Sequence, residues 1–167
     1  MIELIMSLMV WISVHTNYII PDPPSIVLNT KVELRDTIYG CKELKTKNPT
    51  KWNEICREMD WQAKSVVAVY NHDSKVIHLP IYFDLKKLSH QSILLHELVH
   101  HIQYANEYNK KVQCMEELEA QAYTLQEKWL KENNTEMPDD LKIGPIMRSL
   151  VTTCSHFYIP GFFFKIN

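Results

Sequence analysis

The sequence predicts a single α+β domain over residues 1–167. Two stretches, residues 89–105 and 114–130, repeat apolar residues every three or four positions, a pattern typical of amphipathic helices. Residues 65–70 and 75–79 are rich in β-branched and apolar residues and flank a polar turn, which is typical of a β-hairpin. At 167 residues and 46% hydrophobic content, the chain can bury one sizeable core but is short for two domains.

Residues 1–20 predict an N-terminal helix, roughly residues 2–17, that packs on the domain. Leu4–Val14 is apolar apart from two serines, so an atypical export signal is the alternative. Against it, Glu3 is acidic, no basic residue precedes the apolar run, and no Ala-x-Ala-like site appears before Pro21. The run is also too short to span a membrane.

A stiff connector then leads to the first predicted strand. Pro21, Pro23 and Pro24 restrict the backbone to extended conformations. Ile26–Leu34 has the composition of a strand, and residues 40–64 predict a loop with a short helix. The hairpin follows, and it leads into the first of the two long helices.

His96, Glu97 and His100 lie in the helix predicted at residues 89–105. Histidines four residues apart share one face of a helix, so both rings can reach one metal at about 2.0–2.1 Å. Glu97 lies between them, where its carboxylate can accept a proton from a metal-bound water. We therefore expect two zinc ligands and a general base, rather than two histidines of the core or surface.

A third ligand is expected from the second long helix, because catalytic zinc usually has three protein ligands and a water. Glu119 lies 19 residues past the second histidine, beside the apolar stripe of that helix. Glu116 lies one turn earlier on the same face and is the alternative. We favour Glu119, partly because the small residues Ala120 and Ala122 would let the two helices approach closely.

A polar turn at residues 133–140 ends the second long helix, and residues 141–154 predict a further helix. Hydrolysis also needs a hydrogen-bond donor for the developing oxyanion. The candidates in this sequence are Tyr123, His156, Tyr158 and His101. His101 points about 100° away from the preceding ligand around the helix, so we do not expect it as the third ligand.

These residues resemble a small zincin metallopeptidase of the gluzincin type, in which two motif histidines and a downstream glutamate bind zinc, as in thermolysin. A group of uncharacterised bacterial His-Glu-x-x-His domains is more closely similar, over most of residues 5–132. The matching pieces are Trp11-Ile12 with Thr16 and Tyr18, Val67-Ala68-Val69-Tyr70, Ile77-His78-Leu79-Pro80, His96 to Gln103, and Glu119-Ala120 with Tyr123 and Gln126.

The resemblance implies a zincin-like α+β fold, in which a small antiparallel or mixed sheet packs on two central helices that carry the metal site. It also implies His96, His100 and Glu119 as the zinc ligands. Glu97 would be the catalytic base, acting on a peptide or protein substrate. Thermolysin-like enzymes keep an acidic residue one turn after the ligand glutamate, where this chain has Tyr123. That departure leaves the hydrogen-bond partner of one zinc histidine unassigned.

The resemblance also bears on the second strand of the hairpin. In zincins the strand ahead of the metal helix often forms an exposed edge that pairs with an extended substrate. Val76–Leu79 would be that edge. The alternative is that this strand pairs with another strand of the protein, and the sequence does not decide between the two.

The cysteines Cys41, Cys56, Cys114 and Cys154 form no Cys-x-x-Cys pair, which excludes the ordinary structural zinc patterns. Without a clear export signal we expect reduced thiols, with Cys114 buried at a helix start, and a cytoplasmic location. Disulfides in an exported chain are the alternative.

The net charge of −2 and the isoelectric point near 6.4 show no excess of positive charge. We therefore expect neither nucleic acid nor a membrane as partner. The sequence therefore predicts a metallopeptidase with one Zn²⁺ ion. The alternative is a non-catalytic zinc-binding or peptide-interaction domain of the same fold, whose metal is closed off by a fourth ligand such as His156. The cleavage preference and the oligomeric state are not encoded in these patterns.

Overall fold

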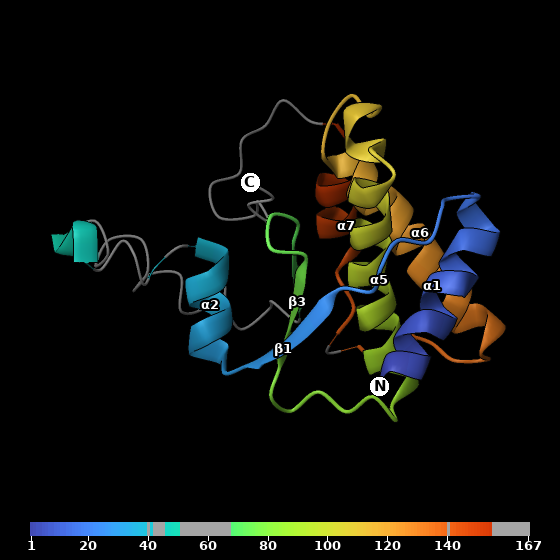
Figure 1. The fold of residues 1–167 in the computed structure, drawn as a ribbon, viewed down its shortest axis with the longest axis horizontal. Coiled ribbons are helices and arrows are strands. Elements are labelled where there is room, and N and C mark those ends of the chain that lie inside the picture. The colour runs from blue at the N-terminus through green and yellow to red at the C-terminus, as the bar shows by residue number, and fades with distance from the viewer. Residues whose placement is uncertain (40, 42–45, 51–67, 140, 155–167) are drawn as a thin grey trace.

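The computed structural model describes residues 1–39, 41, 46–50, 68–139 and 141–154 (Figure 1). Over these residues the protein is an α+β fold, which confirms the predicted class. The elements in chain order are α1 (Ile2–Thr16), β1 (Ser25–Asn29), α2 (Lys31–Tyr39), β2 (Val69–Asn71), β3 (Val76–Pro80), α5 (Leu88–Ala105), the short 3-10 helix η3 (Tyr108–Lys110), α6 (Glu116–Glu132) and α7 (Pro145–Thr152). The loop predicted at residues 40–64 lies mostly outside the described residues.

The sheet has three strands in the order β1-β3-β2. β2 and β3 are antiparallel, with Tyr70 opposite Ile77, which confirms the predicted hairpin. β1 runs parallel to β3 on its other side, with Ile26 opposite Ile77. Of the two alternatives for Val76–Leu79, the structure supports pairing with other strands of the protein and not an exposed edge, because the strand before α5 is central. Within the described chain the edges of the sheet are β1 and β2.

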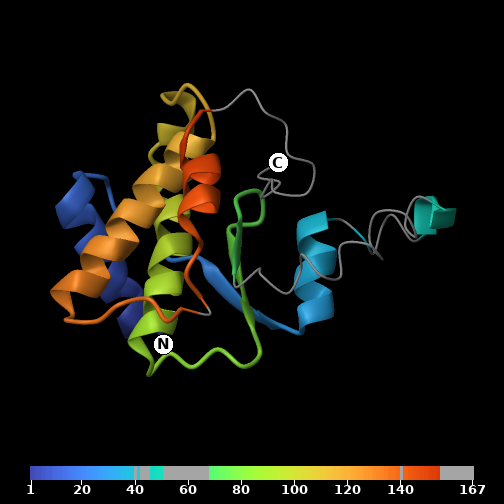
Figure 2. The same cartoon turned by 180° about the vertical axis from the view of Figure 1, so that it is seen from behind.

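Helix α5 lies in the middle of the molecule. Figures 1 and 2 show the sheet on one side of it and α1 and α6 on the other. Every residue from Ser92 to Gln103 is buried. A helix that is covered all round buries its polar side chains as well as its apolar ones. The two motif histidines and Glu97 are therefore carried by the most deeply packed element of the described fold.

The predicted N-terminal helix is confirmed, since α1 packs on the core through Ile5, Leu8, Met9 and Ile12. It ends at Thr16, and Asn17 follows in the left-handed conformation that commonly terminates helices. In the described part of the chain, no helix combines the length and the hydropathy needed to cross a membrane.

Two predicted boundaries are wrong, each for a local reason. The strand predicted at Ile26–Leu34 stops at Asn29, because Thr30 and Glu33 form a capping box that starts α2. The Glu33 carboxylate accepts from the Thr30 N–H at 2.7 Å, and the Glu33 N–H donates to the Thr30 hydroxyl at 3.3 Å. The last helix begins only at Pro145, because proline is suited to a first helical turn and not to a helix interior.

The expectation of reduced thiols is also wrong. Cys114, just before α6, and Cys154, just after α7, form a disulfide with their Cα atoms 5.7 Å apart. No described cysteine is a free thiol. Disulfides persist in oxidising compartments, so the argument from thiols for a cytoplasmic location no longer holds.

Candidate metal centre

His96 and His100 project from the same face of α5 toward α6. Their Nε2 atoms are 3.2 Å apart, and both rings are buried. The helix brings them together because residues four positions apart lie one above the other.

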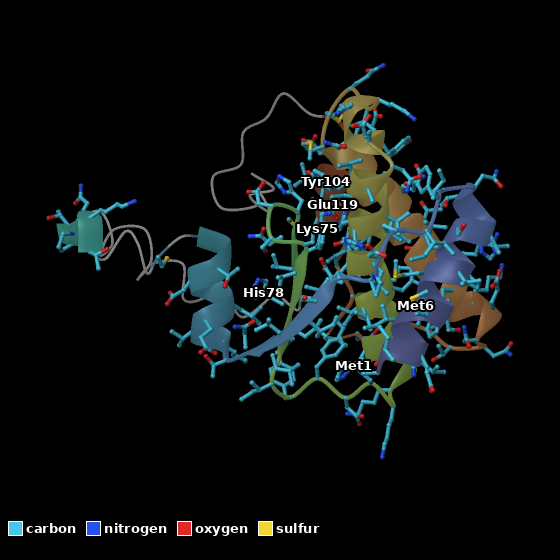
Figure 3. The ribbon with its side chains drawn as sticks, in the orientation of Figure 1. Met1, Met6, Lys75, His78, Tyr104 and Glu119 are labelled. Carbon is cyan, nitrogen blue, oxygen red and sulfur yellow. A yellow bond between two sulfur atoms is a disulfide. The ribbon has the colours of Figure 1, made fainter. Side chains whose placement is uncertain are left out.

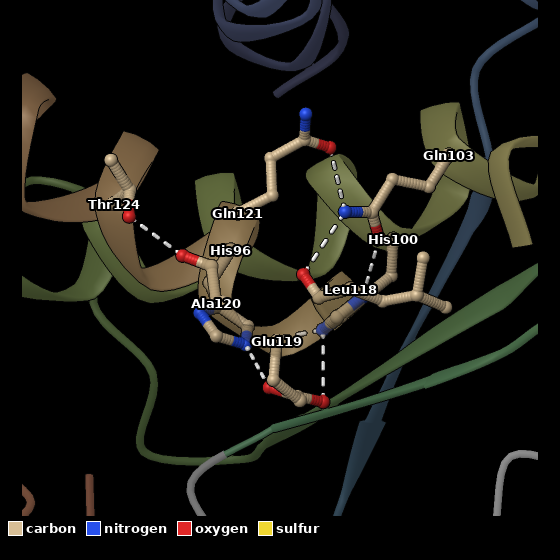
Figure 4. A network of polar contacts seen from close by, with 8 residues as sticks. All are labelled: His96, His100, Gln103, Leu118, Glu119, Ala120, Gln121 and Thr124. Carbon is tan, nitrogen blue, oxygen red and sulfur yellow. Dashed lines mark hydrogen bonds and ion pairs between the residues drawn. The ribbon is translucent and has the colours of Figure 1, made fainter. Parts of the chain in front are cut away.

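Glu119, which lies on α6, forms a group of three candidate ligand residues with His96 and His100 (Figure 4). Its Oε2 lies 3.2 Å from the His96 Nε2, and its Oε1 lies 3.3 Å from the His100 Nε2. The side chain is buried to the same degree as that of His96. Of the two glutamates considered from the sequence, the structure brings Glu119 to the histidines, whereas Glu116 is not part of the group.

The three contacts have the dimensions of a coordination site. Ligands at about 2.0–2.1 Å from a tetrahedral ion are about 3.3–3.4 Å from one another. The two Nε2 atoms are separated by 3.2 Å, which is close to that value, and each of them lies 3.2 or 3.3 Å from a different oxygen of the Glu119 carboxylate. Two imidazole nitrogens and a carboxylate are also donors that zinc accepts. His96, His100 and Glu119 could therefore hold one such ion without a large rearrangement.

Gln103 fixes which nitrogen of His100 faces the centre (Figure 4). The Gln103 Nε2 lies 3.0 Å from the Leu118 carbonyl, which can only accept, so this end of the amide must be the NH₂ group. The Gln103 Oε1 then faces the His100 Nδ1 at 2.9 Å and accepts a hydrogen bond from its N–H. His100 consequently presents Nε2 toward Glu119, as a metal ligand held by an outer hydrogen bond does.

The contact between His100 and Glu119 needs a positive charge. A bare Nε2 lone pair would face a carboxylate oxygen at 3.3 Å, which is repulsive unless a proton or a metal ion lies between them. Without a metal, burial opposes the charged form of His100, but the neighbouring Glu119 outweighs it and raises the pKa of His100 to about 9. The same histidines hold the pKa of the Glu119 carboxyl well below its usual range, against the effect of burial.

A proton should therefore leave when zinc binds. The raised pKa of His100 stabilises the metal-free fold fully below about pH 6.5, and this contribution is lost as the pH rises toward about 9. We expect zinc binding at pH 7.5 to release about one proton, because the ligand must be unprotonated. Calorimetric titrations in buffers of different ionisation enthalpy measure this number, and a binding enthalpy independent of the buffer would contradict it.

Gln103→Leu should weaken zinc binding by about 10–100-fold, the usual cost of losing an outer hydrogen bond to a ligand. The fold should remain, because leucine fills a similar volume. Gln126→Leu is the matched control: Gln126 is also buried between α6 and α5, but it bonds the Ser92 hydroxyl at 3.3 Å instead of a candidate ligand. Equal zinc affinity in the Gln103 variant and the wild type, measured by competition with a chelator, would contradict the role of Gln103.

His96 has no described side chain that bonds its outer nitrogen as Gln103 bonds that of His100. Its Nδ1 is buried and makes no hydrogen bond to any described residue. Where thermolysin-like enzymes carry an acidic residue, the Tyr123 ring meets the His96 ring edge to face, with centroids 4.5 Å apart. The departure noticed in the sequence thus has a structural counterpart, because an aromatic contact orients His96 in place of a hydrogen bond.

Glu97 is buried beside the three candidate ligands. The backbone N–H of Tyr70, on β2, donates to its carboxylate. Burial raises the pKa of Glu97, and the charge of Glu119 acts in the same direction, whereas His96 and His100 oppose it. A carboxylate with a raised pKa is better suited to take up and return a proton near neutral pH than an exposed one.

The oxyanion candidates divide into three groups. Tyr123 lies against the His96 ring, and burial followed by the charges of Glu119 and Glu97 raises its pKa, so its phenol stays protonated and able to donate. His101 is turned away, since its Nε2 bonds the Asp22 carbonyl at 2.8 Å. The remaining candidates, His156 and Tyr158, lie outside the described residues.

Tyr104 was missed in the sequence, although its spacing could have revealed it. It follows His100 by one turn on the ligand face, and Figure 3 shows it near Glu119. Burial raises its pKa to about 12, with contributions from Asp73 and Glu119. His72, from the hairpin turn, stacks on its ring with centroids 4.5 Å apart. This pair borders the centre on the side of the sheet.

The comparisons with known proteins give a family but no activity. The model of a family described as a domain of unknown function (DUF6647) matches residues 1–156, a range that includes every residue of the centre. No curated protein and no solved structure matches the chain.

Proposed function

The chain belongs to the family described as a domain of unknown function (DUF6647), and we propose that it is a zinc-dependent metallopeptidase with a zincin-like fold. The observation that carries the proposal is the triangle of His96, His100 and Glu119 with Glu97 buried beside it. Within the described residues this group has three ligands, which is the number that leaves a catalytic zinc one open position.

Zinc fits the donors better than a harder cation does. Magnesium and calcium prefer sites made wholly of oxygen, whereas two imidazoles and one carboxylate favour zinc. When bound, zinc polarises a carbonyl and lowers the pKa of a water toward 7. The arrangement of the protein's own side chains determines how that chemistry is used.

Glu97 supplies the proton transfer. Its carboxylate takes the proton of the attacking water and later delivers it to the leaving amine. The Tyr70 N–H holds one side of the carboxylate, so the group keeps a fixed position between the sheet and the ligands. Burial excludes bulk water from this exchange.

Tyr123 supplies the hydrogen bond to the oxyanion. Its ring lies against His96, and its hydroxyl makes no hydrogen bond to a described residue, so the O–H can donate to substrate. Donors of this kind contribute about 10²–10³-fold to the rate of acyl transfer.

A peptide substrate is favoured by the position of β2. Within the described sheet β2 is an edge strand, and the bond from its Tyr70 N–H to Glu97 shows that this edge lies beside the centre. An extended peptide can add to such an edge by main-chain hydrogen bonds, which brings its carbonyl groups alongside the centre.

The proposal is tested by incubating the zinc-loaded protein with a mixture of peptides of known sequence and identifying new termini by mass spectrometry. Cleavage should disappear with a chelator and return with zinc. Zinc binding without any cleavage would instead favour the non-catalytic peptide-binding domain of the same fold.

A further inference from the structure

Arg148 of α7 lies on the face of Tyr123. Its guanidinium carbon is 4.4 Å from the ring centroid, a favourable cation–π distance. Its Nη1 donates to the Glu127 Oε1 at 2.7 Å. Glu127 lies one turn beyond Tyr123 on α6, so the arginine spans the ring and the carboxylate on one face of that helix.

The position of the Tyr123 ring depends on contacts to its body. His96 contacts the ring with centroids 4.5 Å apart, and the guanidinium of Arg148 also packs on it. The hydroxyl makes no hydrogen bond to a described residue that would hold the other end. Loss of the arginine would therefore leave Tyr123 free to take other rotamers.

Helix α7, which carries Arg148, is attached less deeply than the long helices that pack on the core. None of its residues is fully buried: Met147, Leu150 and Val151 are half-buried, and Ile146 is 78% exposed. Hydrophobic burial therefore contributes less to its attachment than a fully buried helix face would. The covalent anchor is the disulfide between Cys154, two residues past the end of α7, and Cys114, two residues before α6.

We propose that Arg148 is a positioning residue for Tyr123, and that α7 is a strap whose attachment to α6 by the Cys114–Cys154 disulfide keeps Arg148 in place. This inference rests on the proposed peptidase function and adds a residue that acts on the oxyanion donor from outside the metal centre. A misplacement of a reacting group by about 1 Å can cost about 10²-fold in rate, so the effect should be measurable.

The kinetic test compares zinc-loaded proteins. Arg148→Met, which keeps the apolar bulk but removes the charge, should lower kcat about 10–100-fold with KM within about twofold. Arg148→Lys should restore part of the loss, because an ammonium also binds a ring face. Lys142→Met, which removes an exposed cation paired only with Glu136 and Asp139 among the described residues, should leave kcat unchanged.

The disulfide is tested by replacing Cys114 and Cys154 together with serine. This variant should lose kcat to a similar degree, and combining it with Arg148→Met should cause no further loss, because both changes act through the same contact. Losses that multiply would overturn the proposal, as would a normal kcat in either variant.

Hydrogen exchange of the metal-free proteins provides a readout that does not need activity. In the double-serine variant the amides of α7 should exchange faster, while those of α5 and α6 should not change. Unchanged protection of α7 would overturn the strap even if kcat fell. If the wild type cleaves no peptide, the proposed function and the kinetic role of Arg148 fail together, whereas exchange still decides whether the disulfide holds α7.

Discussion

Glu97→Gln is expected to lower kcat by about 10²–10⁴-fold while zinc remains bound. Glutamine has nearly the same shape, and its amide oxygen can still accept from the Tyr70 N–H that holds Glu97. It cannot take up the proton of a water, so the step that Glu97 is proposed to perform is lost. Single-turnover cleavage of a peptide, with zinc content measured on the same sample, tests this expectation.

The control for Glu97→Gln is Glu107→Gln. Glu107 follows the C-terminal end of α5, and its exposed carboxylate pairs with Lys110 instead of a candidate ligand. This variant should cleave at the wild-type rate. Activity retained in Glu97→Gln would remove the general base from the mechanism. Loss of zinc in that variant would instead show that Glu97 contributes to binding the metal.

Glu119→Gln is expected to weaken zinc binding at least about 10²-fold. Loss of a residue that only hydrogen-bonds a ligand usually lowers metal affinity about 10–100-fold. This change goes further, because it removes a charged group from the candidate ligands themselves. It also leaves His100 without the carboxylate that raises its pKa, so the proton affinity of His100 should fall. Competition with a chromophoric chelator measures the zinc dissociation constant.

Glu116→Gln provides the matched comparison for Glu119→Gln. Glu116 lies one turn earlier on α6, and the structure does not bring it to the histidines. Its substitution should leave zinc affinity within about twofold. If the Glu116 variant lost zinc and the Glu119 variant kept it, the ligand assignment would be wrong.

The parts of the site that follow from helical periodicity were predictable from the sequence. His96 and His100 share a face because they are four residues apart, and Glu119 lies beside the apolar stripe of the next helix. The structure brings these three side chains together. The contacts of Gln103 and Arg148 could not be predicted in this way, because they depend on how α6 and α7 pack against their neighbours.

The wrong predictions have two different causes. The start of α2 was marked by Thr30 and Glu33, a capping box that the apolar run of Ile26–Leu34 concealed. The central position of β3 and the Cys114–Cys154 disulfide had no local signal. Both depend on segments far apart in the chain that the fold brings together, which periodicity and spacing do not report.

The most direct test of the account is the metal content of the wild-type protein, purified without added metal or chelator and measured by elemental analysis. We predict close to one zinc per chain, held at the buried triangle of His96, His100 and Glu119. A protein that contains no zinc, and binds none when zinc is supplied at neutral pH, would contradict the account. The short His100–Glu119 contact would then be a buried ion pair that holds α5 and α6 together.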